Sequence, residues 1–436
     1  MADHSAAVLA QIQRHQGEAV SLLQAMIARQ AKGEAAVQDL VAERLAACGG
    51  QVERLIYEPT SVPLIDEFAT SATAARGERQ SVVARFPTTG SARSLLVFAH
   101  PDGEPLPDVT GWQRPPFAGI IEAGRIHGWG VADDLAGVAA AIFAMEAIAA
   151  AGIVLDGEVI VASTPSKRHA RGISAVLHHG YSADAALYLH PAESGLGMVE
   201  IKAFASGQLE FSIELDGRPP ETTEPAHTAF AHQGVNALDK AMALLAALTA
   251  LDNERARRVH HPLLEAAVGR SSNIMVSALQ FGDLQEFARL PPSLSFSGTV
   301  TFPPSERLET VQAEVETAVA AASNTDPWLR AHPPRLTWLS GVSGMEVPTT
   351  DPLYRLVAAA VEQITGVTPH VNPMHTSSDI RNPAVQKGIP ALGLGPLCGD
   401  LTVGGGHDEW VDVSDYIRSI KVAALAILHW CEGSPT

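Results

Sequence analysis

Two short segments in the first third of the chain carry residue types that can bind a metal ion. The first is the apolar run 95–99, which is followed by His100, Pro101 and Asp102. Such a run predicts a buried strand, and a side chain at the carboxyl end of a parallel strand lies where α/β folds place their sites. His100 can offer one ring nitrogen to a metal ion, while Asp102 can hold the other ring nitrogen in the required tautomer.

The second segment is the glycine-rich run 128–134, which ends on Asp133 and Asp134 and precedes an alanine-rich stretch typical of a packed helix. At this turn Asp133 can supply the carboxylate oxygen that a hard cation prefers. A strand, a loop and a helix with a surface acidic pair would explain the first segment alone. Both segments together, with the histidines further along the chain, favour a metal site.

The elements that position these residues follow from the spacing of the apolar side chains. Helices are expected at about 5–29, 34–47 and 136–151, and strands at 51–57, 81–86, 94–100, 158–163 and 185–190. Strands that alternate with helices predict a largely parallel sheet covered on both faces. After Lys202 the pattern changes to alternating strands at 208–216, 275–279 and 293–302, with helices at 236–251 and 306–321. This change predicts an α+β module with an antiparallel sheet, after which the first pattern resumes at 351–430.

These segments, together with the W-x-x-PPF run at 112–117, resemble the M20 metallopeptidase and deacylase family. That family includes carboxypeptidase G2-like enzymes, aminoacylases, acetylornithine deacetylase, succinyl-diaminopimelate desuccinylase and allantoate amidohydrolase. The resemblance covers nearly the whole chain and implies an α/β catalytic domain with a mostly parallel sheet flanked by helices, plus an inserted α+β lid that also forms the dimer. We expect residues 1–204 and 342–436 to form the catalytic domain and residues 205–341 to form the lid.

The resemblance also implies a set of metal ligands, which this chain only partly retains. By position, Ser166 and Lys167 replace a Glu-Glu pair that serves the family as general base and metal ligand. Serine is a poor base without a partner, and a protonated lysine cannot bind a metal ion. Lys167 or a neighbouring arginine is expected to replace the charge of a second ion. We therefore predict one labile divalent transition metal ion per site (Mn, Zn or Co), with these ligands: His100, Asp133, His190 and His407.

Proton transfer and substrate binding call for further residues. A metal ion can lower the pKa of bound water to about 7 without a base. The sequence offers five candidates for proton transfer and does not choose among them: Glu193, Asp134, His169, Glu104 and Glu409. His227, before the Gly-x-Asn-Ala run at 234–237, resembles a lid histidine that the family uses to reach the reacting oxygen of the partner chain. Either of two arginines can clamp a substrate carboxylate: Arg289 or Arg381, the latter in a segment similar to the family's T-D-x-R turn.

Composition limits the class of protein. The chain has 436 residues, enough for two domains, and a formal net charge of −18, which argues against a nucleic-acid partner. Three scattered cysteines (Cys48, Cys398, Cys431) fit a reducing compartment. No signal peptide or membrane span is expected, so a cytoplasmic location is predicted.

The sequence leaves three functions open. The first is metal-dependent hydrolysis of a C–N bond in a small carboxylate-bearing substrate by a homodimer or higher homo-oligomer, as in a deacylase, aminoacylase or peptidase. The second is an aryl-amine aminohydrolase such as 5-nitroanthranilate aminohydrolase, where attack on a ring carbon would not need the usual glutamate base. The third is a non-catalytic binding protein on a hydrolase scaffold.

Overall fold

A six-stranded sheet forms the centre of the larger part of the molecule. The computed structural model describes residues 4–71, 73–88, 90–103, 106, 109–167, 169–191, 195–222, 228–286, 288–372, 378–399 and 407–432. The sheet has the strand order β1 (Gln51–Tyr57), β3 (Arg79–Phe86), β7 (Gly157–Ser163), β4 (Ala92–Ala99), β8 (Ala185–Tyr188) and β17 (Ala391–Gly393). The last four strands run parallel, whereas β1 and β3 pair antiparallel. The carboxyl ends of β4, β7 and β8 therefore meet at one edge, where the predicted site residues follow them.

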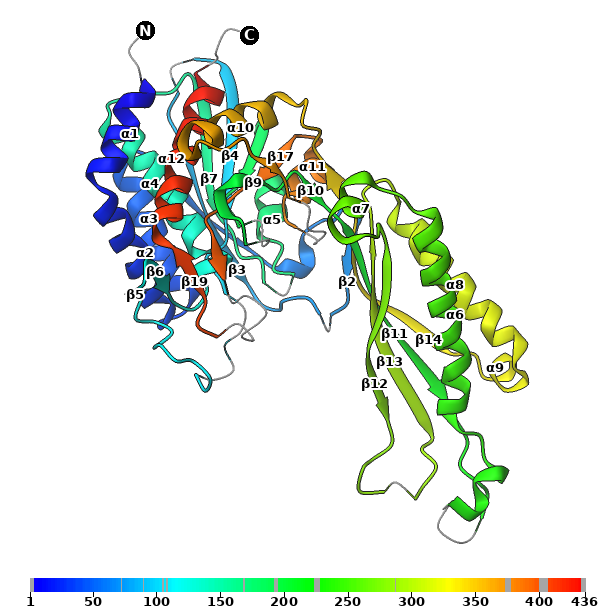
Figure 1. Cartoon of the computed structure of the whole chain (residues 1–436). Helices are drawn as coiled ribbons and strands as arrows, with labels where there is room; N and C mark the ends of the chain where they lie inside the picture. Colours follow the sequence, from blue (N-terminus) through cyan, green and yellow to red (C-terminus); the bar gives the residue numbers. More distant parts are fainter. Residues whose placement is uncertain are drawn as a thin grey trace.

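Helices cover both faces of this sheet (Figure 1). On one face lie α1 (His4–Arg14), α2 (Gln16–Gln30), α3 (Glu34–Ala47), α4 (Ala136–Ala150) and α12 (Val413–Cys431). On the other lie α5 (Gly172–His178) and α11 (Arg381–Lys387), and α10 (Pro352–Thr365) packs beside α12. The crossover from β4 through α4 to β7 moves in the opposite direction along the sheet from the crossover through α5 to β8. Because such crossovers are right-handed, α4 and α5 lie on opposite faces.

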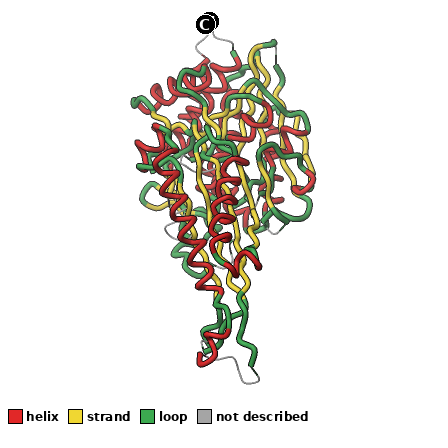
Figure 2. The backbone as a smooth tube through the Cα atoms, turned by 90° about the vertical axis from the view of Figure 1, so that its right-hand side faces the viewer, coloured by secondary structure: helices red, strands yellow, loops and turns green. Residues whose placement is uncertain are grey.

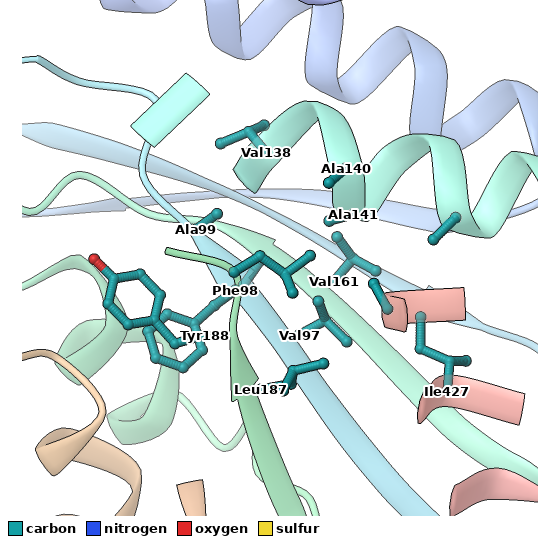
Figure 3. Close-up of a cluster of buried hydrophobic side chains, with 14 of the residues drawn as sticks. Val97, Phe98, Ala99, Val138, Ala140, Ala141, Val161, Leu187, Tyr188 and Ile427 are labelled. Carbon is teal, nitrogen blue, oxygen red and sulfur yellow. The ribbon is translucent and has the colours of Figure 1, made fainter. Parts of the chain in front are cut away.

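The contact between α4 and the sheet forms the main hydrophobic core. Figure 3 shows Val138 and Ala141 of α4 facing Phe98 and Val161 of the sheet, with Ile427 of α12 beside them. Small alanine side chains bring the helix close to the strands, which is the packed helix that the sequence predicts. The approach is closest at Gly137, where a Cβ atom would lie only 1.7 Å from the Leu189 carbonyl oxygen. The loop after β8 is thereby fixed against the start of α4.

A second, elongated part projects from the first, as Figures 1 and 2 show. We call it the lid. Its sheet has the order β12 (Asn273–Phe281), β13 (Ser293–Phe302), β11 (Gly207–Asp216), β14 (Arg335–Val342) and β2 (Glu67–Ala69). On one face of this sheet pack α6 (Ala237–Arg258), α8 (Leu308–Thr325) and the short α9 (Pro327–Ala331), around a hydrophobic cluster separate from the first. All strand pairs in the lid sheet are antiparallel.

The remaining elements are short. They are η1 (Pro59–Ser61), β5 (Ile120–Glu122), β6 (Arg125–His127), η2 (Val131–Leu135), η3 (Gly197–Val199), β9 (Glu200–Ile201), β10 (Phe204–Ala205), η4 (Thr228–Gln233), α7 (Pro262–Val268), β15 (Met345–Glu346), β16 (His370–Val371), β18 (Cys398–Gly399) and β19 (Trp410–Asp412). In the described ranges, no helix has the length and apolar character needed to cross a membrane.

The predicted fold class, an α/β part with an inserted α+β lid, is confirmed. Two details differ. The single helix expected over residues 5–29 is two helices separated at His15, and β2, from the N-terminal third of the chain, adds an edge strand to the lid sheet. The domain limits at 204 and 342 stay a prediction.

Candidate active site

Asp133 lies at the centre of the candidate site. One carboxylate oxygen contacts the Lys167 ammonium, and the other lies 3.0 Å from Nε2 of His190. Burial would raise the pKa of Asp133, but the charges of Lys167 and His190 outweigh burial and hold that pKa well below its usual range. Asp133 is therefore ionised, and the Lys167 ammonium of the same chain already pairs with its carboxylate.

His100 contacts a different carboxylate. Its Nδ1 lies 2.5 Å from the Thr164 carbonyl oxygen, and its Nε2 lies 3.0 Å from Oδ2 of Asp379. This second contact is close in distance only, because in the described part of the chain the buried Nε2 has no partner of hydrogen-bond geometry. Asp379 also accepts a 2.6 Å hydrogen bond from Ser166 Oγ. Although burial opposes it, the contacts with His100 and Ser166 hold the pKa of Asp379 at about 2.

Asp102 has a role other than the predicted one. The prediction that Asp102 holds the second nitrogen of His100 is wrong, because the Thr164 carbonyl takes that place. Asp102 instead accepts hydrogen bonds of 2.9 Å from the backbone N–H groups of both Ser166 and Lys167. The two amides fix the loop after β7, and this loop directs Lys167 toward Asp133.

The predicted convergence of four metal ligands is not found. His190 pairs with Asp133 and His100 with Asp379, while the His407 ring packs beside Gly111 and meets the Trp112 ring edge-on at a centroid distance of 6.2 Å. Across the described ranges, no three His, Cys, Asp or Glu side chains are grouped so that they could hold a metal ion. The physical reason at Asp133 is the Lys167 ammonium, which already contacts its carboxylate.

The two-ion centre implied by the family resemblance does not fit these residues, since Ser166 and Lys167 are not metal ligands and Lys167 is a cation. His100, Asp133 and His190 have the donor atoms that one ion takes, but in the described part of the chain they are not grouped around one point. Nδ1 of His190 lies 2.7 Å from the Pro191 carbonyl oxygen, closer than the 3.4 Å to Lys202 Nζ. Nε2 of His190 also lies 3.0 Å from the ionised Asp133 carboxylate, which can only accept, so His190 donates this hydrogen bond through Nε2.

Asp134 and Glu409, two of the residues predicted as candidates for proton transfer, are buried near Asp133. Asp134 accepts from the backbone N–H groups of His100 at 3.4 Å and Gly137 at 3.1 Å, and burial together with the charge of Asp133 raises its pKa well above the usual range. The same two causes raise the pKa of Glu409 to about 8. Glu409 is therefore mostly protonated at neutral pH, and the raised pKa of Asp134 also disfavours its ionised form, so neither is a ready base.

The two arginines predicted to bind substrate lie in unlike places. Arg289 is exposed in the loop between β12 and β13, at the end of the lid away from the central sheet, and pairs with Glu286 at 3.1 Å (Figure 1). The side chain of Arg381 is buried, and each of its three nitrogens donates to protein acceptors, among them Glu67 at 2.9 Å and the carbonyl oxygens of Ile65 and Ser343. Arg381 thus ties α11 to the lid, and substrate binding by this residue stays a prediction.

A cavity of about 360 Å³ opens beside Asp133 and His190. Most of its lining comes from the larger part of the molecule, and Val342 comes from the lid strand β14. Four residues that the sequence reasoning did not single out also line it: Glu67, Arg171, Lys202 and Asp379. Lys202 could have been found from the sequence, because it is a charged residue inside the apolar stretch 201–205. Nothing in the sequence around Arg171 marks it as a site residue. Glu193 and His227 lie outside the described residues.

Comparison with known proteins agrees with this architecture. Residues 96–429 match the family model described as peptidase family M20/M25/M40. The chain is 25% identical over 355 residues to N-formyl-4-amino-5-aminomethyl-2-methylpyrimidine deformylase of Halalkalibacterium halodurans, which covers 78% of this chain and 80% of that protein. It is 26% identical over 357 residues to succinyl-diaminopimelate desuccinylase of Xanthobacter autotrophicus, with 79% and 81% covered. The structure of the dipeptidase Dug1p from Saccharomyces cerevisiae superposes with a TM-score of 0.72 at 16% identity and covers 100% of both chains.

Proposed function

The chain belongs to peptidase family M20/M25/M40 and is a hydrolase that acts on C–N bonds, and from this premise we propose that it cleaves an amide of a small carboxylate-bearing substrate in the cavity beside Asp133. The observation that carries the proposal is the lining of this cavity. Four cationic side chains and three carboxylates line it, although the whole chain has a formal net charge of −18. A positive cavity in an acidic protein favours an anionic substrate.

We propose one divalent ion, Mn, Zn or Co, with His100, Asp133 and His190 as ligands. Such an ion supplies a water of lowered pKa and polarises the carbonyl group. The ion must compete with Lys167 for Asp133, which supports weak binding. His407 remains a proposed ligand only if its ring leaves Trp112.

The chain's own groups orient the reaction. Asp102 holds the amides of Ser166 and Lys167, so the Lys167 ammonium stays beside Asp133 and adds positive charge near the reacting carbonyl oxygen. The backbone carbonyls of Thr164 and Pro191 keep the Nε2 atoms of His100 and His190 directed into the site. Glu193 remains the proposed group for proton transfer.

We also propose a homodimer or higher homo-oligomer through the lid, with His227 acting on the partner chain's site. The edge strand β12 supports this, because it exposes Met275 and Leu279 at 55% and 51%. An exposed apolar edge strand is a ready pairing surface. The three free thiols, Cys48, Cys398 and Cys431, are in keeping with a cytoplasmic location.

The test is a hydrolysis screen on chelator-stripped protein with Mn²⁺, Co²⁺ or Zn²⁺ added back. The panel holds N-formyl, N-acetyl and N-succinyl amino acids, dipeptides, and aminobenzoates for the aryl-amine alternative, which no observation in the structure favours. We expect release of an amine from an acylated amino acid. Binding of these compounds without turnover under any metal condition would contradict the proposal.

A further inference from the structure

Two buried arginines share one carboxylate beside the candidate site. Arg381 Nη1 lies 2.9 Å from Glu67, whereas Arg171 Nε lies 3.9 Å from the same side chain. The three side chains are only 2%, 6% and 8% exposed for Arg381, Arg171 and Glu67. A single carboxylate thus faces two guanidinium groups, and solvent does little to compensate the second charge.

Arg171 is the less satisfied of the two. Its Nη1 donates to the Pro59 carbonyl oxygen at 2.8 Å, but its buried Nε has no hydrogen-bond partner among the residues that the structure describes. Burial lowers the pKa of Arg171. A buried guanidinium donor without an acceptor is costly, and an incoming anion would remove that cost.

Ser378 supplies a second unsatisfied donor in the same cavity. Its Oγ is buried and has no hydrogen-bond partner within the described ranges. Ser378 and Arg171 both line the cavity that Asp133 and His190 also line. A hydroxyl and a guanidinium N–H are donors that a carboxylate group accepts. Neither Arg381 nor Arg289 competes for this role, since the first is fully engaged and the second lies at the far end of the lid.

We propose that Arg171 and Ser378 form the subsite that binds the carboxylate of the substrate. This inference rests on the proposed function and adds to it the position of the anionic group. With the carboxylate held on the Glu67 side of the cavity, the scissile amide of a short substrate extends toward Asp133 and His190. The expected class is a short N-acyl amino acid or other small carboxylate, and a neutral amide of the same shape is expected to bind poorly.

The first test measures binding and needs no turnover. Titration calorimetry with succinate and with its neutral analogue succinamide compares wild type, Arg171→Gln, Arg171→Lys and Ser378→Ala. The matched control is Arg85→Gln. Arg85 lies on β3, outside the cavity, and its guanidinium group pairs with Glu158 of β7 at 2.8 Å. Loss of a charge-assisted hydrogen bond predicts about 10–100-fold weaker succinate binding in Arg171→Gln. We expect an intermediate loss in Arg171→Lys, a loss of about 3–10-fold in Ser378→Ala, and wild-type binding in the control.

The second test uses turnover of an N-acyl amino acid and of its methylamide. Arg171→Gln should raise KM for the acid by about 10–100-fold with a smaller effect on kcat, and should leave the methylamide unchanged. If Arg171→Gln does not fold, Arg171→Lys and Ser378→Ala carry the test. Succinate binding that depends on Arg171 in a protein without hydrolytic activity would support the subsite and refute the proposed function. Unchanged discrimination between acid and methylamide in active, folded variants would overturn the subsite.

Discussion

The contact between Lys167 and Asp133 makes a quantitative prediction about stability and metal binding. Replacement of Lys167 by methionine keeps the side-chain length but removes the ammonium, so Asp133 loses a cation at a site where the two side chains are 14% and 21% exposed. Breaking a fully buried pair costs about 3–5 kcal/mol. Since both groups retain some contact with solvent, we expect Lys167→Met to lower the free energy of unfolding by about 2 kcal/mol in the presence of chelator.

The same change should strengthen divalent-ion binding. In the wild type an incoming ion must displace the ammonium from Asp133, whereas in Lys167→Met it finds the carboxylate unpaired. If about 2 kcal/mol of competition is removed, the ion's affinity rises about 30-fold. Urea denaturation with EDTA and with Mn²⁺ measures the stability, and calorimetry measures ion affinity and stoichiometry.

A lid ion pair provides the matched control. Lys240 Nζ lies 2.8 Å from Asp326, and their side chains are 25% and 23% exposed. Lys240→Met should cost no more than about 1 kcal/mol and should not change the response to Mn²⁺. The reasoning is refuted if Lys167→Met matches this control both in stability with chelator and in ion affinity. Two tightly bound ions in the wild type would also refute it.

Three further predictions concern other parts of the chain. Arg381→Gln should lower the free energy of unfolding by about 3 kcal/mol in urea denaturation, because the buried Glu67 loses its partner; an effect below 1 kcal/mol would contradict the structural role. Burial and the charge of Asp102 raise the pKa of Glu34 to about 7, so stability from this group is present at acidic pH and is lost as pH rises from about 4.5 to 7. Glu34→Gln should therefore raise stability at pH 8 relative to wild type by at most about 3 kcal/mol, and urea curves at pH 5 and pH 8 test this. Mixed His227→Ala and Asp133→Ala chains, each inactive alone, should recover activity, and no recovery after proven subunit exchange would show that His227 does not act across an interface.

Most of the strands and helices could be predicted from the local spacing of apolar residues. The strand at 51–57 and the alanine-rich helix after the 128–134 turn lie where apolar spacing places them, because each is specified by its own residues. The edge strand β2 could not be found in this way. Its three residues Glu67–Ala69 pair with Ser340–Val342, and only the folded chain brings together segments so far apart in sequence.

In the candidate site, too, features with a local sequence signature could be predicted, whereas contacts between distant segments could not. A histidine after β4 and an aspartate at a glycine-rich turn were visible because strand ends and turns have local signatures. The hydrogen-bond partner of His100 could not be predicted, because it is the backbone carbonyl of Thr164 and every residue type has such a group. The role of Arg381 was also hidden, because its T-D-x-R-like segment says nothing of Glu67, more than three hundred residues away.

The proposed replacement of two carboxylates by Ser166 and Lys167 has a consequence for how this site works. A lysine ammonium supplies positive charge near a reacting carbonyl oxygen, as a second metal ion would, but it cannot carry a hydroxide. In the proposed mechanism, charge stabilisation comes from Lys167, whereas water activation would come from the single ion proposed at His100, Asp133 and His190. The binding of the substrate carboxylate at Arg171 and Ser378 is a third, independent function. Lys167 and Arg171 share the loop between β7 and α5, whereas His100 follows β4, His190 follows β8 and Ser378 precedes α11. Single substitutions at these positions would measure the share of each group in the reaction.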